Sequence, residues 1–194
     1  MEQNPWSGSD VPRGALYDRR FEELAAVGKN IHGEADLVDS YGPGPVLDAG
    51  CGTGRLAIEL SRRAHRTVGV DRDAGMLDAA RQKAPDLVWV EGDLADPELV
   101  LAGPFDTVVM AGNVLIFVNP GTEGLVITNM ARRLRPGGRL VAGYSLAPGG
   151  LDVGTHDALA AASGLVLEDR WSTWERGPFN PASNYAVSVH RLAR

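Results

Sequence analysis

A short apolar segment that runs into closely spaced glycines and then into an amphipathic helix constrains this 194-residue chain more than any other feature. Residues 45–48 predict a buried strand, and Gly50, Gly52 and Gly54 predict a tight turn. From Arg55 onwards, apolar residues recur at helical spacing. We expect the turn to leave unpaired backbone N–H groups facing a crevice, where a ligand can approach the backbone closely.

The chain after this turn alternates strands with helices. We predict strands at 46–49, 67–70, 87–91, 105–111 and 139–145, and helices at 55–64, 73–83, 97–101, 122–134 and 152–163. Two further strands, near 164–167 and at 185–190, follow each other without a helix, which predicts an antiparallel hairpin. The predicted fold class is α/β: a doubly wound, seven-stranded, mostly parallel sheet with a C-terminal antiparallel hairpin and helices on both faces.

Two helices are predicted before the first strand. The first lies between a capping Asp10 and Gly28, and the second runs from Glu34 to about Tyr41. We interpret residues 1–44 as an N-terminal helical segment that covers a cleft. Residues 45–194 contain no further domain boundary, so they form the α/β domain itself.

Composition and charge narrow the classes of partner. A net charge of −6 opposes extended contact with nucleic acid or with an anionic membrane face. No apolar run is long enough to cross a bilayer, and the first residues lack the layout of a signal peptide. The single cysteine, Cys51, permits no internal disulfide, and the four histidines lack ligand spacing, so we expect no metal. A cytoplasmic protein is the expectation.

Three acidic residues follow three predicted parallel strands and are expected at one edge of the sheet. Asp71 ends the second strand and can accept both hydroxyls of a ribose; helix capping is the alternative, although Asp73 is available for that. Asp93 follows the third strand and can accept from an adenine amino group, with a turn or a cap as its alternative. Asp48, before the glycines, would be costly to bury without a cation or backbone donors.

The glycine turn, these acids and a Pro-Gly-Gly turn at 136–138 occur in the order typical of the class I S-adenosylmethionine-dependent methyltransferases, which the chain resembles over residues 45–145. The Pro-Gly-Gly turn is predicted to end the preceding helix and reverse the chain. The resemblance implies an enzyme that transfers a methyl group from S-adenosylmethionine to a small-molecule acceptor and releases S-adenosylhomocysteine. It also implies that Asp48 lies near the ammonium end of the cofactor.

The resemblance extends to further positions of the cofactor site. It implies that Met76 packs on the adenine and that the Leu94 backbone meets a ring nitrogen. Ala111, with Gly112, leaves space for the sulfonium, and Asn113 can orient the donor or the acceptor. The residues expected to bind the cofactor are Asp48, Gly50, Cys51, Gly52, Thr53, Gly54, Asp71, Arg72, Met76, Asp93, Leu94, Ala111 and Asn113.

The acceptor side is predicted less directly. His32 is the preferred candidate for a general base because its ordinary pKa is near neutrality; Glu34 and Tyr17 are the alternatives, and Asn113 is a second catalytic candidate. Tyr17, Arg20 and Tyr144 are predicted to line the acceptor pocket, with core packing as the alternative for the aromatic residues.

Two other functions stay open at this point. The first is an NAD-dependent oxidoreductase of Rossmann type, which Asp48, the terminal hairpin and Arg55 (in place of a fingerprint glycine) disfavour. The second is a catalytically silent cofactor-binding protein. The absence of an Asn/Asp-Pro-Pro-Tyr sequence after the fourth strand disfavours amino-methylating DNA enzymes, and the absence of an acidic pair disfavours a Mg²⁺-dependent reaction.

Overall fold

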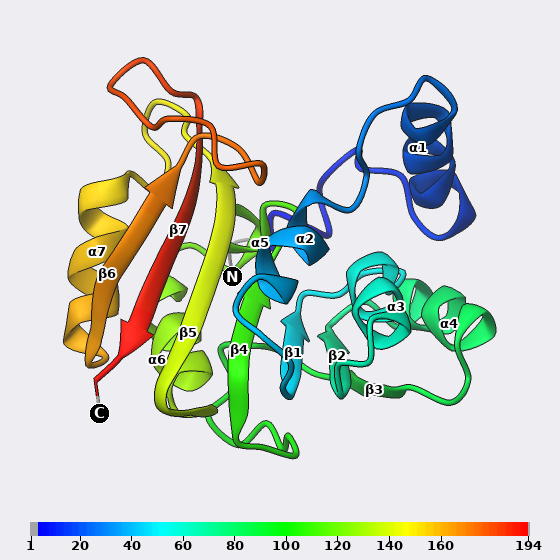
Figure 1. Cartoon of the computed structure of the whole chain (residues 1–194), viewed down its shortest axis with the longest axis horizontal. Coiled ribbons are helices and arrows are strands. Elements are labelled where there is room, and N and C mark those ends of the chain that lie inside the picture. The colour runs from blue at the N-terminus through cyan, green and yellow to red at the C-terminus, as the bar shows by residue number, and fades with distance from the viewer. Residues whose placement is uncertain (1–3, 194) are drawn as a thin grey trace.

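The protein, as a computed structural model, contains one seven-stranded sheet, and the structure describes residues 4–193 (Figure 1). The strand order is β3-β2-β1-β4-β5-β7-β6. The strands are β1 (Val46–Ala49), β2 (Thr67–Asp71), β3 (Val88–Glu91), β4 (Phe105–Met110), β5 (Leu134–Ser145), β6 (Leu165–Trp171) and β7 (Tyr185–Leu192). Strands β1 to β5 are parallel, and β7 is antiparallel to both β5 and β6. The predicted fold class is therefore confirmed.

Helices cover both faces of the sheet. They are α1 (Ala15–Ala26), α2 (Gly33–Asp39), α3 (Arg55–Arg62), α4 (Ala74–Lys83), α5 (Val114–Phe117), α6 (Glu123–Ala131) and α7 (Val153–Ala162). Successive residues of a strand face opposite sides. Thus Val46 of β1 joins a core cluster with Leu60 of α3, whereas Leu47 joins the cluster on the other face with Ile127 of α6.

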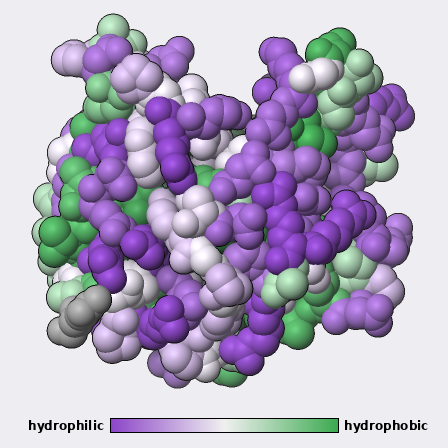
Figure 2. All heavy atoms as spheres, viewed as in Figure 1, coloured by the Kyte–Doolittle hydropathy of each residue, from purple (hydrophilic) through white to green (hydrophobic). Residues whose placement is uncertain are grey.

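The N-terminal segment differs from the rest in how it packs. Helix α2 buries Leu37 and Val38 against the body, whereas every residue of α1 keeps some exposure. Figure 1 shows α1 standing beside the body at the end of the sheet near α3. In Figure 2 the outline of the molecule is notched between α1 and the loop that joins β6 to β7, and hydrophilic residues cover much of this face. In the described residues, no helix has the length and apolarity needed to cross a membrane.

One predicted helix is absent, and one short helix was not predicted. Residues 97–98 form a turn and 99–101 have no regular structure, so the predicted helix is absent. Asp96 accepts from the Glu98 backbone N–H at 2.9 Å, and Leu99 and Leu101 are buried. Five residues offer too few hydrogen bonds to offset the cost of helix nucleation. Conversely, β4 ends at Met110, and the apolar run after it contains the short helix α5, which we did not predict.

The Pro-Gly-Gly turn also has a different role from the predicted one. Helix α6 ends at Ala131, and β5 already begins at Leu134, which pairs with Phe105 of β4. The register then shifts between Phe105 and Thr107, and Gly137 has a φ of +78°. The turn therefore makes an irregularity inside β5, because the helix has ended before Pro136 is reached.

The strand order places a crevice at one point of the sheet. The chain moves from β1 outwards to β3 and then returns to β4 on the other side of β1. Ligands of such sheets bind at the carboxyl ends of the strands where the order reverses. That point lies after Ala49 of β1 and after Met110 of β4.

Candidate cofactor-binding site

The glycine turn after β1 has the tight geometry that its sequence predicts. Gly50, Gly52 and Gly54 have φ values of +80°, +53° and +81°, a region that residues with a Cβ rarely adopt. A Cβ at Gly50 would lie 2.5 Å from Cγ2 of Val114 in α5. The turn therefore needs glycine both for its backbone and for the close approach of α5.

Several backbone amides of this turn are paired, where the sequence predicted unpaired ones. The Gly52 N–H donates to Oδ2 of Asp71 at 2.8 Å, and the Ala57 N–H donates to Oδ2 of Asp48 at 3.0 Å. The two amides before Gly52 donate to the carbonyl of Val70. The Gly52 and Ala57 N–H groups therefore donate to carboxylates of the protein and are not available to a phosphate. A pyrophosphate here would meet the carboxyl groups of Asp48 and Asp71, so the donor set disfavours a dinucleotide and suits a ligand with a cationic end.

One cavity lies at the carboxyl ends of β1 to β4, and the three predicted acids all line it. Ten of the predicted cofactor residues belong to its lining: Asp48, Gly50, Cys51, Gly52, Asp71, Arg72, Met76, Asp93, Leu94 and Ala111. The sequence argument therefore brought the acids, the turn and the end of β4 together correctly in space.

Asp71 is fixed by the backbone around it. Its Oδ1 accepts from the Asp73 N–H at 2.9 Å, in addition to the bond from Gly52 to its Oδ2. Burial raises the pKa of Asp71, while these backbone donors lower it. Asp73 caps α4 by accepting from the Met76 N–H at 3.1 Å. Asp73 therefore fills the capping position of α4, and the Asp71 carboxylate lies on the cavity wall.

Asp93 combines a turn with a position on the cavity wall. Its Oδ1 accepts from the Ala95 N–H at 2.9 Å, and its Oδ2 lies 3.6 Å from Nη1 of Arg72. Leu94, beside it, is buried and lines the same cavity. The local turn orients the carboxylate, so the turn and the ligand-binding interpretation are compatible.

Asp48 is the most deeply buried of the three acids, with a relative exposure of 2%. Burial raises its pKa to about 7, although the Arg55 guanidinium and the Ala57 N–H both favour the charged form. A buried carboxylate with one hydrogen bond is costly unless a cation approaches it. Such a group at a cavity wall is suited to an ammonium ligand.

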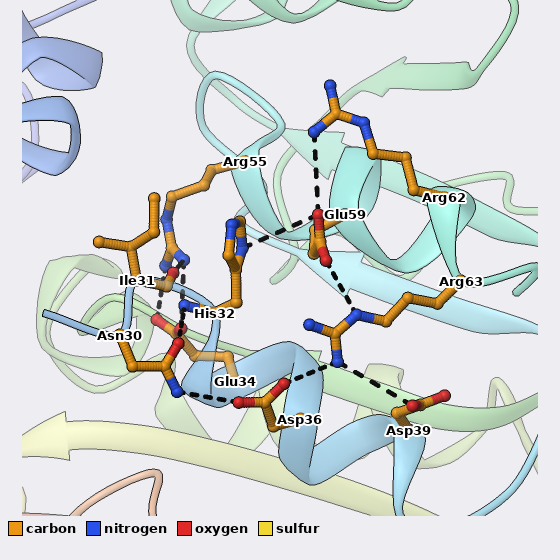
Figure 3. Close-up of polar contacts among 10 residues, drawn as sticks. All are labelled: Asn30, Ile31, His32, Glu34, Asp36, Asp39, Arg55, Glu59, Arg62 and Arg63. Carbon is orange, nitrogen blue, oxygen red and sulfur yellow. Dashed lines mark hydrogen bonds and ion pairs between the residues drawn. The ribbon is translucent and has the colours of Figure 1, made fainter. Parts of the chain in front are cut away.

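Arg55, the first residue of α3, lines the cavity beside Asp48. Its guanidinium makes a bidentate pair with Glu34 of α2, at 2.5 Å to Oε1 and 3.1 Å to Oε2, and donates to the Ile31 carbonyl (Figure 3). The Arg55 guanidinium also lies over the Phe21 ring, with 4.2 Å between the guanidinium carbon and the ring centroid. The N-terminal segment therefore holds this arginine on several sides.

The N-terminal segment also closes part of the cavity. Trp6 and Tyr17 line it, together with Phe117 of α5. Trp6 contacts Phe117 edge-on with 5.3 Å between the ring centroids, and its Nε1 donates to Asp73 at 2.8 Å. Sequence reasoning missed Trp6 and Phe117, because no local pattern indicates that these two segments meet.

Three predicted cofactor residues lie outside the cavity lining. The Thr53 side chain is buried and donates to Asp18 at 2.5 Å. Gly54 packs against Trp89, which a Cβ there would approach to 2.4 Å. Asn113 has a φ of +69° and accepts from the Ser145 N–H at 2.8 Å through its Oδ1. All three residues therefore belong to turns around the site and do not line the cavity itself.

Two candidates from the N-terminal segment are also outside the lining. His32 precedes α2, and its Nδ1 lies 4.0 Å from Oε2 of Glu59 in α3 (Figure 3). Arg20 is exposed on α1. The structure does not support a base at His32 or an acceptor contact at Arg20, whereas Tyr17 does lie on the wall.

Tyr144 is a core residue, contrary to the predicted acceptor role. It is fully buried and packs edge-on against His156 of α7, with 5.2 Å between ring centroids. His156 in turn contacts His190 of β7, whose Nε2 lies 2.9 Å from Oδ1 of Asp157. Two histidines that are 34 positions apart in sequence are thus brought together, which their spacing did not reveal. Arg170 also donates to that Asp157 oxygen, so a guanidinium occupies the place beside the carboxylate.

Comparison with known proteins agrees with this geometry. Residues 46–138 match a family described as a methyltransferase domain. A TehB-like SAM-dependent methyltransferase from Corynebacterium glutamicum has a similar structure, with a TM-score of 0.83 and 36% identity, over 92% of this chain and 97% of that one.

Two curated relatives are more distant. An uncharacterised methyltransferase of Schizosaccharomyces pombe is 30% identical over 73% of this chain and 52% of its own length. The magnesium-protoporphyrin O-methyltransferase of Rhodobacter capsulatus is 39% identical over 45% of this chain and 40% of its own length. The matches thus span about half or less of these curated relatives.

The class is defined by three findings. They are a doubly wound sheet with a terminal hairpin, a glycine turn with acids at three strand ends, and a match over nearly the whole length of one solved member. The chain belongs to the class I S-adenosylmethionine-dependent methyltransferases, and S-adenosylmethionine is the cofactor of this family. This finding displaces the oxidoreductase interpretation. The residues present fit the cofactor, because the acids suit its hydroxyl, amino and ammonium donors and the carboxylates paired with the Gly52 and Ala57 amides disfavour a pyrophosphate.

Proposed function

We propose that the protein transfers the methyl group of S-adenosylmethionine directly to a small-molecule acceptor. The observation that carries this proposal is the common cavity of Asp48, Asp71 and Asp93 at the reversal point of the sheet. In it, Asp71 would hold the ribose, Asp93 and the Leu94 backbone the adenine, and Asp48 the ammonium group. Bound S-adenosylmethionine supplies an electrophilic methyl carbon on a sulfonium.

The protein's own task is then to position the acceptor and exclude water. Positioning can supply roughly 7–11 kcal/mol of the barrier to a reaction between two bound molecules. Ala111 and Gly112 after β4 leave room on the wall, and Tyr17 lies across from Gly112, with its hydroxyl 3.6 Å from the place of a Cβ there. Burial raises the pKa of Tyr17, so its hydroxyl stays neutral and can donate to an acceptor atom.

The N-terminal segment, which contributes to the cavity wall, limits the size of the acceptor. Trp6 and Tyr17 of the N-terminal segment form part of the cavity wall, and an enclosed cavity favours a small molecule over a folded macromolecule. The net charge of −6 further opposes a nucleic acid. The Rhodobacter relative, by its name, methylates a porphyrin. We further propose that residues 1–44 act as a cap segment over the 45–194 domain, and that the protein works in the cytoplasm, as its acidic composition and lone cysteine favour.

The test is methyl transfer from radiolabelled S-adenosylmethionine to a panel of metabolite fractions, with separate detection of labelled protein and labelled nucleic acid. We expect label in the small-molecule fraction. Label confined to protein or nucleic acid would contradict the proposed acceptor class. Binding of the cofactor without transfer to any fraction would favour a catalytically silent binding protein.

A further inference from the structure

Arg55 occupies a position that helix electrostatics disfavour. It is the first residue of α3, where the helix dipole places positive charge, and its side chain is only 16% exposed. Burial of a guanidinium at such a place requires a close anion. Two carboxylates are near enough to influence it, Glu34 of α2 and Asp48 at the end of β1.

Arg55 is paired with only one of these two acids. Both terminal nitrogens of the guanidinium contact the Glu34 carboxylate, in the planar fork that arginine and carboxylate prefer. Within residues 4–193, no ion pair or hydrogen bond joins Arg55 to Asp48. Asp48 accepts from the Ala57 backbone and otherwise faces the cavity.

The other contacts of Arg55 keep it in this orientation. Its Nη1 also donates to the Ile31 carbonyl, and the guanidinium lies over the Phe21 ring. Figure 3 shows Arg55 directed towards Ile31 and Glu34, on the N-terminal segment. Glu34, itself 13% exposed, has Arg55 as its partner in the described ion pairs.

From this geometry we propose, on the basis of the cofactor site proposed above, that Glu34 is a positioning residue which holds Arg55 away from Asp48. Asp48 is thereby left free to accept the ammonium group of the cofactor. Without Glu34, Asp48 is the carboxylate that remains for Arg55, and a direct Arg55–Asp48 pair competes with the ligand. The N-terminal segment therefore controls recognition of the amino-acid end of the cofactor.

The experiment compares two ligands and three variants by calorimetry. S-adenosylhomocysteine carries the amino-acid end, whereas methylthioadenosine has the same nucleoside without it. The variants are Glu34→Gln, the double change Glu34→Gln with Arg55→Met, and the control Glu59→Gln. Glu59 belongs to the same charge network but pairs with Arg63 at 2.9 Å (Figure 3), and it is not among the residues that line the cavity.

We expect Glu34→Gln to weaken S-adenosylhomocysteine binding about tenfold or more, as loss of a charge-assisted bond does, and to change methylthioadenosine binding less than about twofold. The double variant should recover most of the lost affinity, because the competing guanidinium is gone. Glu59→Gln should leave both affinities unchanged.

Several outcomes would overturn the proposal. Equal weakening of both ligands would assign Glu34 to packing of the cap, and no weakening would remove it from the site. A double variant weaker than Glu34→Gln would show that Arg55 itself binds the ligand. Failure of the unaltered protein to bind either ligand would instead count against the proposed function.

Discussion

The burial of Asp48 in the candidate cofactor site predicts a lower free energy of unfolding for the ligand-free protein. The pKa of Asp48 rises from 3.8 to about 7 in the folded protein, which corresponds to about 4 kcal/mol against the ionised form. Because the folded pKa lies above the unfolded one, the penalty is absent below pH 4 and complete above pH 7. Asparagine keeps the oxygen that accepts from Ala57 and removes the charge.

We therefore expect Asp48→Asn to stabilise the ligand-free protein, by about 2 kcal/mol at pH 5 and about 4 kcal/mol at pH 8. The same change should weaken binding of S-adenosylhomocysteine. The assay is urea unfolding of both proteins at several pH values, with the free energies of unfolding extrapolated to water. A variant that is less stable than the parent at pH 8, or a difference that does not grow with pH, would refute the reasoning.

Three further predictions concern other residues. Asp71→Ala should weaken S-adenosylhomocysteine binding with little change in melting temperature; unaltered affinity in calorimetry would remove Asp71 from the ribose site. His32→Ala should leave the rate of methyl transfer unchanged, because His32 lies outside the cavity, and a marked fall in that rate would restore it as a base. Burial lowers the pKa of His156 to about 3, so unfolding is favoured as the pH falls below 6.5, by about 2 kcal/mol at pH 5 relative to pH 7. His156→Phe should flatten this part of the urea-derived stability profile, and an unaltered slope would contradict that origin.

Local sequence was sufficient for the fold class and for bringing much of the candidate site together in one cavity. Strand ends in a parallel sheet share one edge, so the residues after each strand meet in space whatever their separation along the chain. Asp48, Asp71 and Asp93 obey this rule, and the structure places all three on one cavity. The capping role of Asp73 was also readable, because a helix start requires an acceptor at that position.

The remaining features depend on packing between distant segments. Tyr144 fits the alternating pattern of its strand, but the neighbouring sequence does not indicate whether its side chain enters the core or the cavity. In the structure it is buried in the core. The contact of His156 with His190 and that of Trp6 with Phe117 each join elements far apart in sequence. The pairing of the Gly52 amide with Asp71 was not predicted, because no sequence signal shows that Asp71 folds back onto Gly52.

The central claim concerns the three carboxylates at strand ends and the glycine turn whose Gly52 amide is paired with Asp71. Together they bind a nucleoside joined to an amino acid, and not a dinucleotide. Calorimetric titration of the purified protein with S-adenosylhomocysteine and, separately, with NADH tests this most directly. We predict saturable binding of S-adenosylhomocysteine and no heat of binding with NADH. Binding of NADH without any binding of S-adenosylhomocysteine would contradict the account.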